Sequence, residues 1–171
     1  MAKPLATQLR QGWPMVILLM ASIVFVYHFS LRIDVSNSLD EKGYLISNNK
    51  HPKRLDYIEF MPPQTSKAPQ GYSFVKIVKG VAGDRVTIKD RDVYINEEYV
   101  GTAQPQSKNG VNLQMISETI IPENHYFVWT PHEYSYDSRY QDIGLISANL
   151  IQGIAHPISI KYFAKKLMEF V

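Results

Sequence analysis

The chain has no cysteine among its 171 residues, which excludes disulfides, thiolate nucleophiles and cysteine-based zinc sites. It also has no marked excess of one charge, because 18 basic and 16 acidic residues give a net charge of +2. No basic block stands out, so nothing indicates a nucleic-acid partner. The histidines at positions 51, 125, 132 and 156 lack a metal-ligand spacing with carboxylates, and we therefore expect no metal and no cofactor.

One long apolar run is present, at residues 14–31, without Asp, Glu, Lys or Arg. As a helix it would be about 27 Å long, close to the hydrocarbon thickness of a bilayer, roughly 30 Å. Trp13 and Tyr27 lie near its ends, where amphipathic rings prefer the membrane interface. Lys3 and Arg10 precede the run. We therefore predict a cytoplasmic segment 1–13, a single transmembrane anchor 14–31 and a periplasmic domain 32–171 at a bacterial inner membrane.

A cleaved secretory signal is the alternative interpretation of this run. The residues that follow it, from His28 to Ile33, are mostly large and offer no site with small residues spaced two apart. The sequence therefore favours an anchor that stays attached.

The rest of the chain alternates short apolar segments with polar turns. Residues 85–89 and 92–95 flank a polar pair and predict a hairpin, whereas 61–71 is rich in proline and 102–110 is polar, so both read as loops. Residues 158–170 have an ambiguous pattern. Many short strands with few helix-length periods predict a mostly β, partly closed domain. The predicted strands are 31–35, 43–46, 55–60, 72–78, 85–89, 92–95, 119–121 and 126–129.

Two serines, Ser36 and Ser38, follow the predicted anchor closely. In an extended chain they point to the same face, and they lie at most roughly 25 Å beyond the membrane exit. One serine could attack a carbonyl while the other, with the backbone N–H of the nucleophile, stabilises the oxyanion. Serines in such a segment are also common turn residues, so the local sequence alone leaves both interpretations open.

Lys76 lies in the apolar segment 74–78. Burial there would lower the pKa of its amine and make it a candidate general base. Alternation places Lys76 on one face of the strand and Lys79 on the other, so the period does not choose between them. An edge strand with two solvated lysines is the alternative.

Two further polar segments complete the set. Residues 80–85 place Gly80 and Gly83 in a predicted tight turn with positive φ, and the segment lacks the ending of a phosphate loop. Ser135 precedes Asp137 and Arg139, and this segment could orient a base and brace a loop through charge-assisted hydrogen bonds. A polar surface turn is the alternative for residues 135–140.

In their order and spacing these four segments resemble the signal-peptidase family of serine–lysine proteases, and most closely its conjugal-transfer branch of the TraF type, which matures pilin precursors. The resemblance implies a signal-peptidase-like β domain behind one N-terminal helix. It implies Ser38 as nucleophile, the Ser38 N–H and the Ser36 hydroxyl as oxyanion donors, and Lys76 as general base in preference to Lys79.

The same resemblance implies that Ser135 orients the lysine and that Asp137 and Arg139 form a supporting salt bridge. The implied function is cleavage of leader peptides from exported precursors, in conjugative pilin maturation, without a cofactor. The implied partners are the precursor, the inner membrane and components of a conjugation apparatus.

Some positions depart from the family pattern. Asp40 and Glu41 stand where a proline is usual, Leu55 replaces a glycine, and Ala82 replaces a proline. Residues 130–134 stand in place of the Gly-Asp-Asn segment of housekeeping enzymes, which together with the small size favours the conjugal branch.

The sequence admits two other interpretations. A triad of Ser38, His132 and Asp137 can be assembled, but the lysine interpretation uses more of the sequence. A catalytically silent, membrane-tethered β module that holds a partner would need neither Ser38 nor Lys76.

Overall fold

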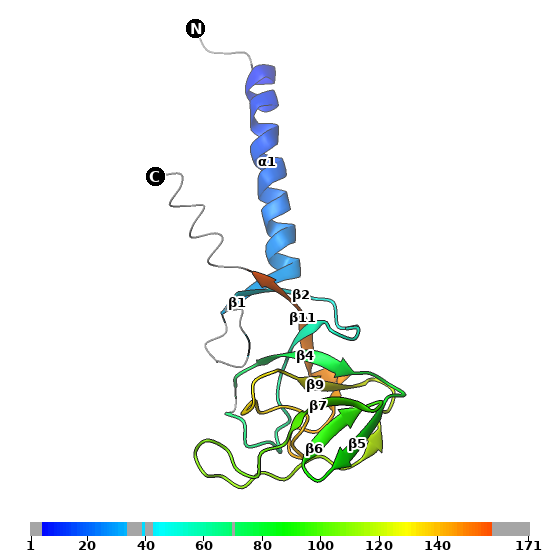
Figure 1. Cartoon of the computed structure of the whole chain (residues 1–171). Helices are drawn as coiled ribbons and strands as arrows, with labels where there is room; N and C mark the ends of the chain where they lie inside the picture. The colour runs from blue at the N-terminus through cyan, green and yellow to red at the C-terminus, as the bar shows by residue number, and fades with distance from the viewer. Residues whose placement is uncertain (1–4, 34–38, 40–42, 70, 159–171) are drawn as a thin grey trace, which may run out of the picture. The chain divides into compact units, whose positions relative to one another are not determined.

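The computed structural model describes residues 5–33, 39, 43–69 and 71–158, and for residues 5–12 it describes the backbone only. The chain divides into two compact units, Met1–Ser30 and Leu31–Val171. Figure 1 shows one helix in the first unit and β-strands in the second.

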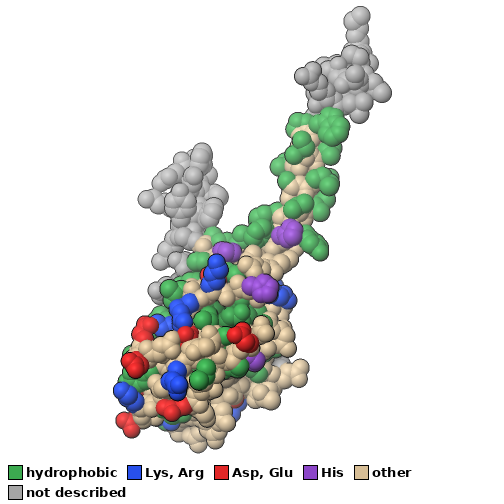
Figure 2. All heavy atoms as spheres, turned by 90° about the vertical axis from the view of Figure 1, so that its right-hand side faces the viewer, with side chains coloured by type: hydrophobic (Ala, Val, Ile, Leu, Met, Phe, Trp, Pro, Cys, Tyr) green, Lys and Arg blue, Asp and Glu red, His purple; other side chains and the backbone are tan. Residues whose placement is uncertain are grey.

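The N-terminal unit is a single helix, α1 (Leu5–His28), in which Pro14 is internal. Its described apolar side chains, from Trp13 to Tyr27, are exposed along its length (Figure 2). The helix begins nine residues before the predicted anchor and ends three residues before the end of it. Within the residues described, no helix combines the length and apolarity that crossing a bilayer requires.

The second unit is mostly β, as predicted. Its larger sheet has seven strands in the order β1-β2-β11-β3-β4-β9-β10. These strands are β1 (Phe29–Ile33), β2 (Gly43–Ser47), β3 (Tyr57–Phe60), β4 (Phe74–Gly80), β9 (His125–Trp129), β10 (Ile146–Ser147) and β11 (Ile151–Ile158). A short 3-10 helix, Ala148–Leu150, joins the last two.

The smaller sheet has four strands in the order β7-β6-β5-β8. They are β5 (Arg85–Lys89), β6 (Asp92–Ile95), β7 (Glu98–Thr102) and β8 (Thr119–Ile120). β5 and β6 form the predicted hairpin, with Val86 opposite Ile95 and Lys89 opposite Asp92. In Figure 1 this sheet lies below β4 and β9, which pair with each other in the larger sheet.

Three apolar clusters hold the β-rich unit together. One lies under the smaller sheet, around Val86, Ile95 and Phe127. A second lies on one face of β3 and β4, around Ile58 and Val78. A third contains Leu39, Tyr44, Ile46 and Ala155, and it borders Val75 and Ile77 of β4. Because β4 has a different cluster against each face, its alternate side chains enter different environments.

The turn between β4 and β5 depends on Asp84. Its carboxylate accepts a hydrogen bond from the Val81 N–H at 2.8 Å, one from Asn96 Nδ2 at 2.7 Å and two from Arg54 Nη2 at 2.7 and 2.8 Å. Gly83 adopts φ +87°, which an L side chain rarely adopts. Gly80 has no such angle; a Cβ there would lie 2.6 Å from the Ile121 side chain, so close packing explains this glycine.

The structure corrects the predicted strands in several places. β4 spans Phe74–Gly80 and not 72–78, and β10 was not predicted. β1 begins at Phe29 and not at Leu31, and β3 begins at Tyr57 and not at Leu55. Leu55 itself has φ 72°, which interrupts an extended strand. β11 was not predicted at all, although it lies inside the larger sheet between β2 and β3.

Candidate active site

Lys76 lies in the middle of β4 and is buried, with 5% of its surface exposed. The register of β3 and β4 places it opposite Ile58, on the face that also carries Val78. Ile58 and Val78 are both fully buried in one apolar cluster. Burial in such surroundings disfavours the ammonium form of a lysine, because the charged form loses its hydration.

Lys79 takes the opposite face of β4. Its Nζ donates a 2.6 Å hydrogen bond to the carboxylate of Glu98, an exposed residue on β7. This hydrogen bond, with the charge of the ammonium, holds the pKa of Glu98 below its usual value. The two lysines that alternation left equivalent therefore differ: Lys76 is buried and Lys79 is in a surface ion pair.

Ser135 is a polar partner of Lys76 within the described residues. Lys76 Nζ donates to Ser135 Oγ at 2.9 Å, and the two residues are 59 positions apart in sequence. Ser135 is 1% exposed. Its N–H donates to the His132 carbonyl at 3.0 Å, which closes a turn after β9. The backbone that carries the hydroxyl is therefore held in a turn, and the hydroxyl offers the lysine amine a defined acceptor.

An ion pair between Asp137 and Arg139 also holds this turn in place. Arg139 Nε and Nη2 each lie 2.9 Å from a different Asp137 oxygen, and both side chains are at most 2% exposed. The same Nη2 donates to the carbonyls of His132 and Ser135 at 3.2 Å. Burial alone would lower the pKa of Arg139, but the bonds with Asp137 raise it above its usual value, so the guanidinium stays charged.

Ser138 attaches this segment to β9. Its Oγ accepts from the Val128 N–H at 2.9 Å, and its N–H donates to the Val128 carbonyl at 3.0 Å. Residues 135–139 are thus not a polar surface turn, because four of the five are buried. The charges and hydroxyls are satisfied internally, as buried polar groups require.

Ser36, Ser38 and Asp40 lie outside the described residues. Leu39, between the last two, is described; it is 6% exposed and packs with Tyr44, Ile46 and Ala155. Val75, next to Lys76 in β4, borders the same cluster.

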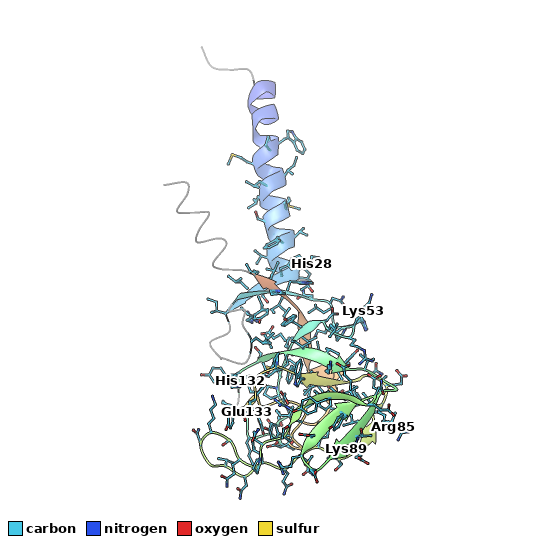
Figure 3. The ribbon with its side chains drawn as sticks, viewed as in Figure 1. His28, Lys53, Arg85, Lys89, His132 and Glu133 are labelled. Atoms are coloured by element: carbon cyan, nitrogen blue, oxygen red, sulfur yellow. The ribbon has the colours of Figure 1, made fainter. Side chains whose placement is uncertain are left out.

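The triad of Ser38, His132 and Asp137 receives no support from the described geometry. Asp137 bonds Arg139, and the His132 Nδ1 accepts from the Tyr134 N–H at 3.1 Å. Figure 3 shows His132 and Glu133 on the loop after β9, away from Arg85 and Lys89 of β5. In the described part of the chain no three His, Asp or Glu side chains gather as metal ligands.

A cavity of about 220 Å³ borders the segment that carries Ser135. Tyr134 and Tyr136, the two neighbours of Ser135, line it together with Val111 and Leu113 of the segment after β7. Arg91 holds this segment by donating to the carbonyls of Ala103 and Gln104 at 2.5 and 3.0 Å. The sequence predicted only an exposed polar excursion here.

One buried acid was missed by the sequence analysis. Glu59 is 2% exposed, on β3, and bonds Arg32 and Ser73. The signal was available, because Glu59 interrupts an apolar strand as Lys76 does.

Comparisons with known proteins assign the chain to a family. Residues 6–160 match the family described as "Signal peptidase, peptidase S26". A signal peptidase I from Enterococcus faecalis V583 is similar in structure, with 25% sequence identity, a TM-score of 0.39, and coverage of 61% of this chain and 96% of that one. No curated protein matches the chain. Since the family match extends over most of its length, the chain belongs to the signal peptidase family of serine-type peptidases.

Proposed function

We propose that the protein is a membrane-bound endopeptidase that removes leader peptides from exported precursors with a Ser38–Lys76 dyad. The observation that carries the proposal is the 2.9 Å hydrogen bond from the buried Lys76 Nζ to Ser135 Oγ. It gives an amine in an apolar environment a fixed direction, as a general base needs. Lys79 is instead paired with the exposed carboxylate of Glu98, which favours its ammonium form.

In the proposed reaction, neutral Lys76 takes the proton of Ser38 Oγ while that oxygen attacks the scissile carbonyl. The Ser38 N–H and the Ser36 hydroxyl donate to the oxyanion. As the tetrahedral intermediate collapses, the Lys76 ammonium returns the proton to the leaving amine and an acyl-enzyme remains. Water activated by the same lysine, or an amine of the substrate itself, then resolves the acyl-enzyme.

The packing of Leu39 supports Ser38 as the nucleophile. Leu39 follows Ser38 directly, and Val75 precedes Lys76 directly. Leu39 and Val75 belong to one apolar cluster. Leu39, one residue after the proposed nucleophile, therefore packs in the cluster that borders the strand of the proposed base.

Asp137 and Arg139 have supporting roles in the proposal. The guanidinium binds the carbonyls on either side of the turn that carries Ser135, so it fixes the hydroxyl that orients Lys76. Neither side chain bonds Lys76 in the described contacts, so we assign them no proton transfer.

We further propose that the precursor is a pilin of a conjugation system, with the protein anchored by residues 14–31 in the inner membrane and its β-rich unit in the periplasm. The support is the apolar run and the replacement of the housekeeping Gly-Asp-Asn segment by residues 130–134. Within this proposal the precursor and the conjugation apparatus are the partners.

The test is cleavage of a candidate pilin precursor by the full chain in detergent. Ser38→Ala and Lys76→Ala should abolish the product, and Lys79→Ala should cut like wild type. Normal cleavage by Ser38→Ala would remove the serine from the mechanism. Processing of a general secretory precursor at the same rate as the pilin would overturn the conjugal assignment. Unchanged precursor with wild type and all variants would favour the silent module.

A further inference from the structure

A carboxylate inside the larger sheet has no part in the proposed reaction so far. Glu59 lies on β3, between β11 and β4, and is 2% exposed. A buried carboxylate is costly unless it is paired and hydrogen-bonded. Glu59 Oε1 accepts from Arg32 Nε at 2.8 Å and from Ser73 Oγ at 2.6 Å.

The two donors come from the two segments that the proposed reaction must bring together. Arg32 is in β1, six residues before Ser38. Ser73 directly precedes β4 and is three residues before Lys76. One carboxylate oxygen of Glu59 therefore links the strand that precedes Ser38 with the start of the strand that carries Lys76.

Glu59 cannot act on the lysine directly. In the register of β3 and β4, Glu59 is opposite Val75, whereas Lys76 is opposite Ile58. Neighbouring residues of a strand point to opposite faces of the sheet. The carboxylate and the amine are thus on different faces, and any influence of Glu59 on the reaction runs through the strands.

Fold stability does not by itself account for a charge at this position. An apolar side chain of similar size usually serves stability as well as a buried ion pair does, or better. A buried polar group can instead select one arrangement of the segments it joins. Glu59 has the geometry for this role, because its two donors differ by 41 positions in sequence and share one oxygen.

We infer that Glu59 is a positioning residue of the peptidase: through Arg32 and Ser73 it sets the segment leading to Ser38 against the strand that carries Lys76. This inference rests on the proposed Ser38–Lys76 dyad. A displacement of about 1 Å between reacting groups can cost about 100-fold in rate. Loss of the linkage should therefore reduce kcat and leave precursor binding nearly unchanged.

The experiment measures kcat and KM of precursor cleavage by the full chain. Glu59→Gln should lower kcat by about 10- to 100-fold, with KM within about twofold of wild type. Because Glu59→Gln could also impair folding, Arg32→Gln and Ser73→Ala provide a second test. Arg32 is half exposed and Ser73 is exposed, so neither change opens the core. Each should lower kcat by about three- to tenfold.

Two comparisons separate positioning from a general loss of structure. Arg32→Lys keeps a cation within reach of Glu59 and should recover most of the lost kcat. Arg85→Gln, an exposed arginine on β5 (Figure 3), should have wild-type kinetics. The double variant Arg32→Gln/Glu59→Gln should be no slower than Glu59→Gln alone, because both changes break one linkage.

Some outcomes would overturn the inference. If Arg32→Gln and Ser73→Ala keep the wild-type kcat while Ser38→Ala and Lys76→Ala are inactive, the dyad stands and Glu59 has no positioning role. If Arg32→Gln raises KM at constant kcat, Arg32 binds the precursor instead. If Ser38→Ala or Lys76→Ala cuts normally, the proposed function itself fails.

Discussion

Two carboxylate–guanidinium pairs brace loops in the β-rich unit. The Asp137–Arg139 pair lies after β9, and the Arg54–Asp84 pair lies at the turn after β4. In each pair the guanidinium also donates to a backbone carbonyl, and the carboxylate accepts from a backbone N–H group. The local chemistry of the two pairs is therefore nearly the same.

Their burial differs. The side chains of Asp137 and Arg139 are 0% and 2% exposed, whereas Arg54 is 42% and Asp84 is 10% exposed. A half-exposed pair is screened by water and contributes little to the free energy of unfolding. A fully buried pair is strongly destabilising to break, since the remaining charge is left without hydration.

The buried pair is the one beside the candidate active site. Arg139 binds the carbonyl of Ser135, whose hydroxyl accepts from Lys76. Arg54 binds the carbonyl of Lys79, the surface lysine of the same strand. Between these two pairs, burial rather than the type of interaction distinguishes the one that braces the site from the one that braces a turn.

The two lysines provide the largest expected contrast. Lys76→Ala should reduce kcat for precursor cleavage by about 10⁴-fold or more, because the proposed reaction loses its base. Lys79→Ala removes the ion pair with the exposed Glu98 and a contact with the Trp129 ring, and it should stay within about twofold of wild type. Steady-state kinetics on matched preparations checks both, and equal losses for the two variants would end the distinction.

Asp137→Asn tests the buried pair through stability. Removing one partner of a buried ion pair should lower the free energy of unfolding by about 3–5 kcal/mol, because Arg139 keeps its charge. Arg54→Gln, its matched control at the exposed pair, should cost about 1 kcal/mol or less. Urea denaturation of the full chain in detergent measures both. Similar costs for the two substitutions would show that burial is not the deciding variable.

Ser135→Ala should affect rate more than stability. It removes one acceptor from Lys76, and a hydrogen bond to a charged or ionisable group is worth about 1.5–3 kcal/mol, or roughly 10- to 100-fold in kcat. Ser138→Ala is the control: it leaves the buried Val128 N–H without its hydroxyl acceptor but does not touch the lysine. Ser138→Ala should therefore lower the melting temperature while the folded enzyme keeps its kcat. A fast Ser135→Ala variant would mean that Lys76 is oriented by other contacts.

Most strands could be predicted from the sequence, because alternation of β-branched and aromatic residues is a local signal. β11 was missed because Gly153 and Pro157 interrupt its pattern. The structure explains Gly153: a Cβ there would lie 2.0 Å from the Ser47 carbonyl oxygen, where β11 passes β2 and bulges against β3. Such a close approach depends on distant strands, so no local pattern predicts it.

The candidate site was predictable in part for the same reason. Alternation placed one lysine on each face of β4, and only the apolar clusters around the strand decide which face is buried. The resemblance to a family selected Lys76 and connected it with Ser135, a contact between residues far apart in sequence. The roles of Ser36 and Ser38 remain predictions. Glu59 was missed because its donors lie on two other segments.

The contribution of the exposed Arg54–Asp84 pair to the free energy of unfolding should depend on pH. Burial alone would raise the pKa of Asp84, but hydrogen bonds from Val81, Asn96 and Arg54 hold it below its usual value. A carboxyl with a lowered pKa stabilises the fold above its unfolded pKa, and this contribution is lost as the pH falls through the folded pKa. The stability difference between wild type and Asp84→Asn should therefore be constant near neutral pH and shrink below about pH 4. A difference that grows in acid would contradict the assignment.

Replacement of Leu55, which lies between Arg54 and Asp56, should have the smallest effect. Unlike the other substitutions, it should stabilise the fold. Leu55 has φ 72° and is 65% exposed, so it carries backbone strain with little packing in return. Leu55→Gly should raise the free energy of unfolding by about 0.5–1 kcal/mol, since relief of strain exceeds the extra chain entropy of glycine. Leu55→Ala keeps a Cβ and should show no gain. Both variants should keep wild-type kcat, because Leu55 adjoins the exposed Arg54–Asp84 pair and not the buried Asp137–Arg139 pair. If Leu55→Gly loses activity at unchanged stability, the exposed leucine serves the reaction and the division between the two braces is wrong.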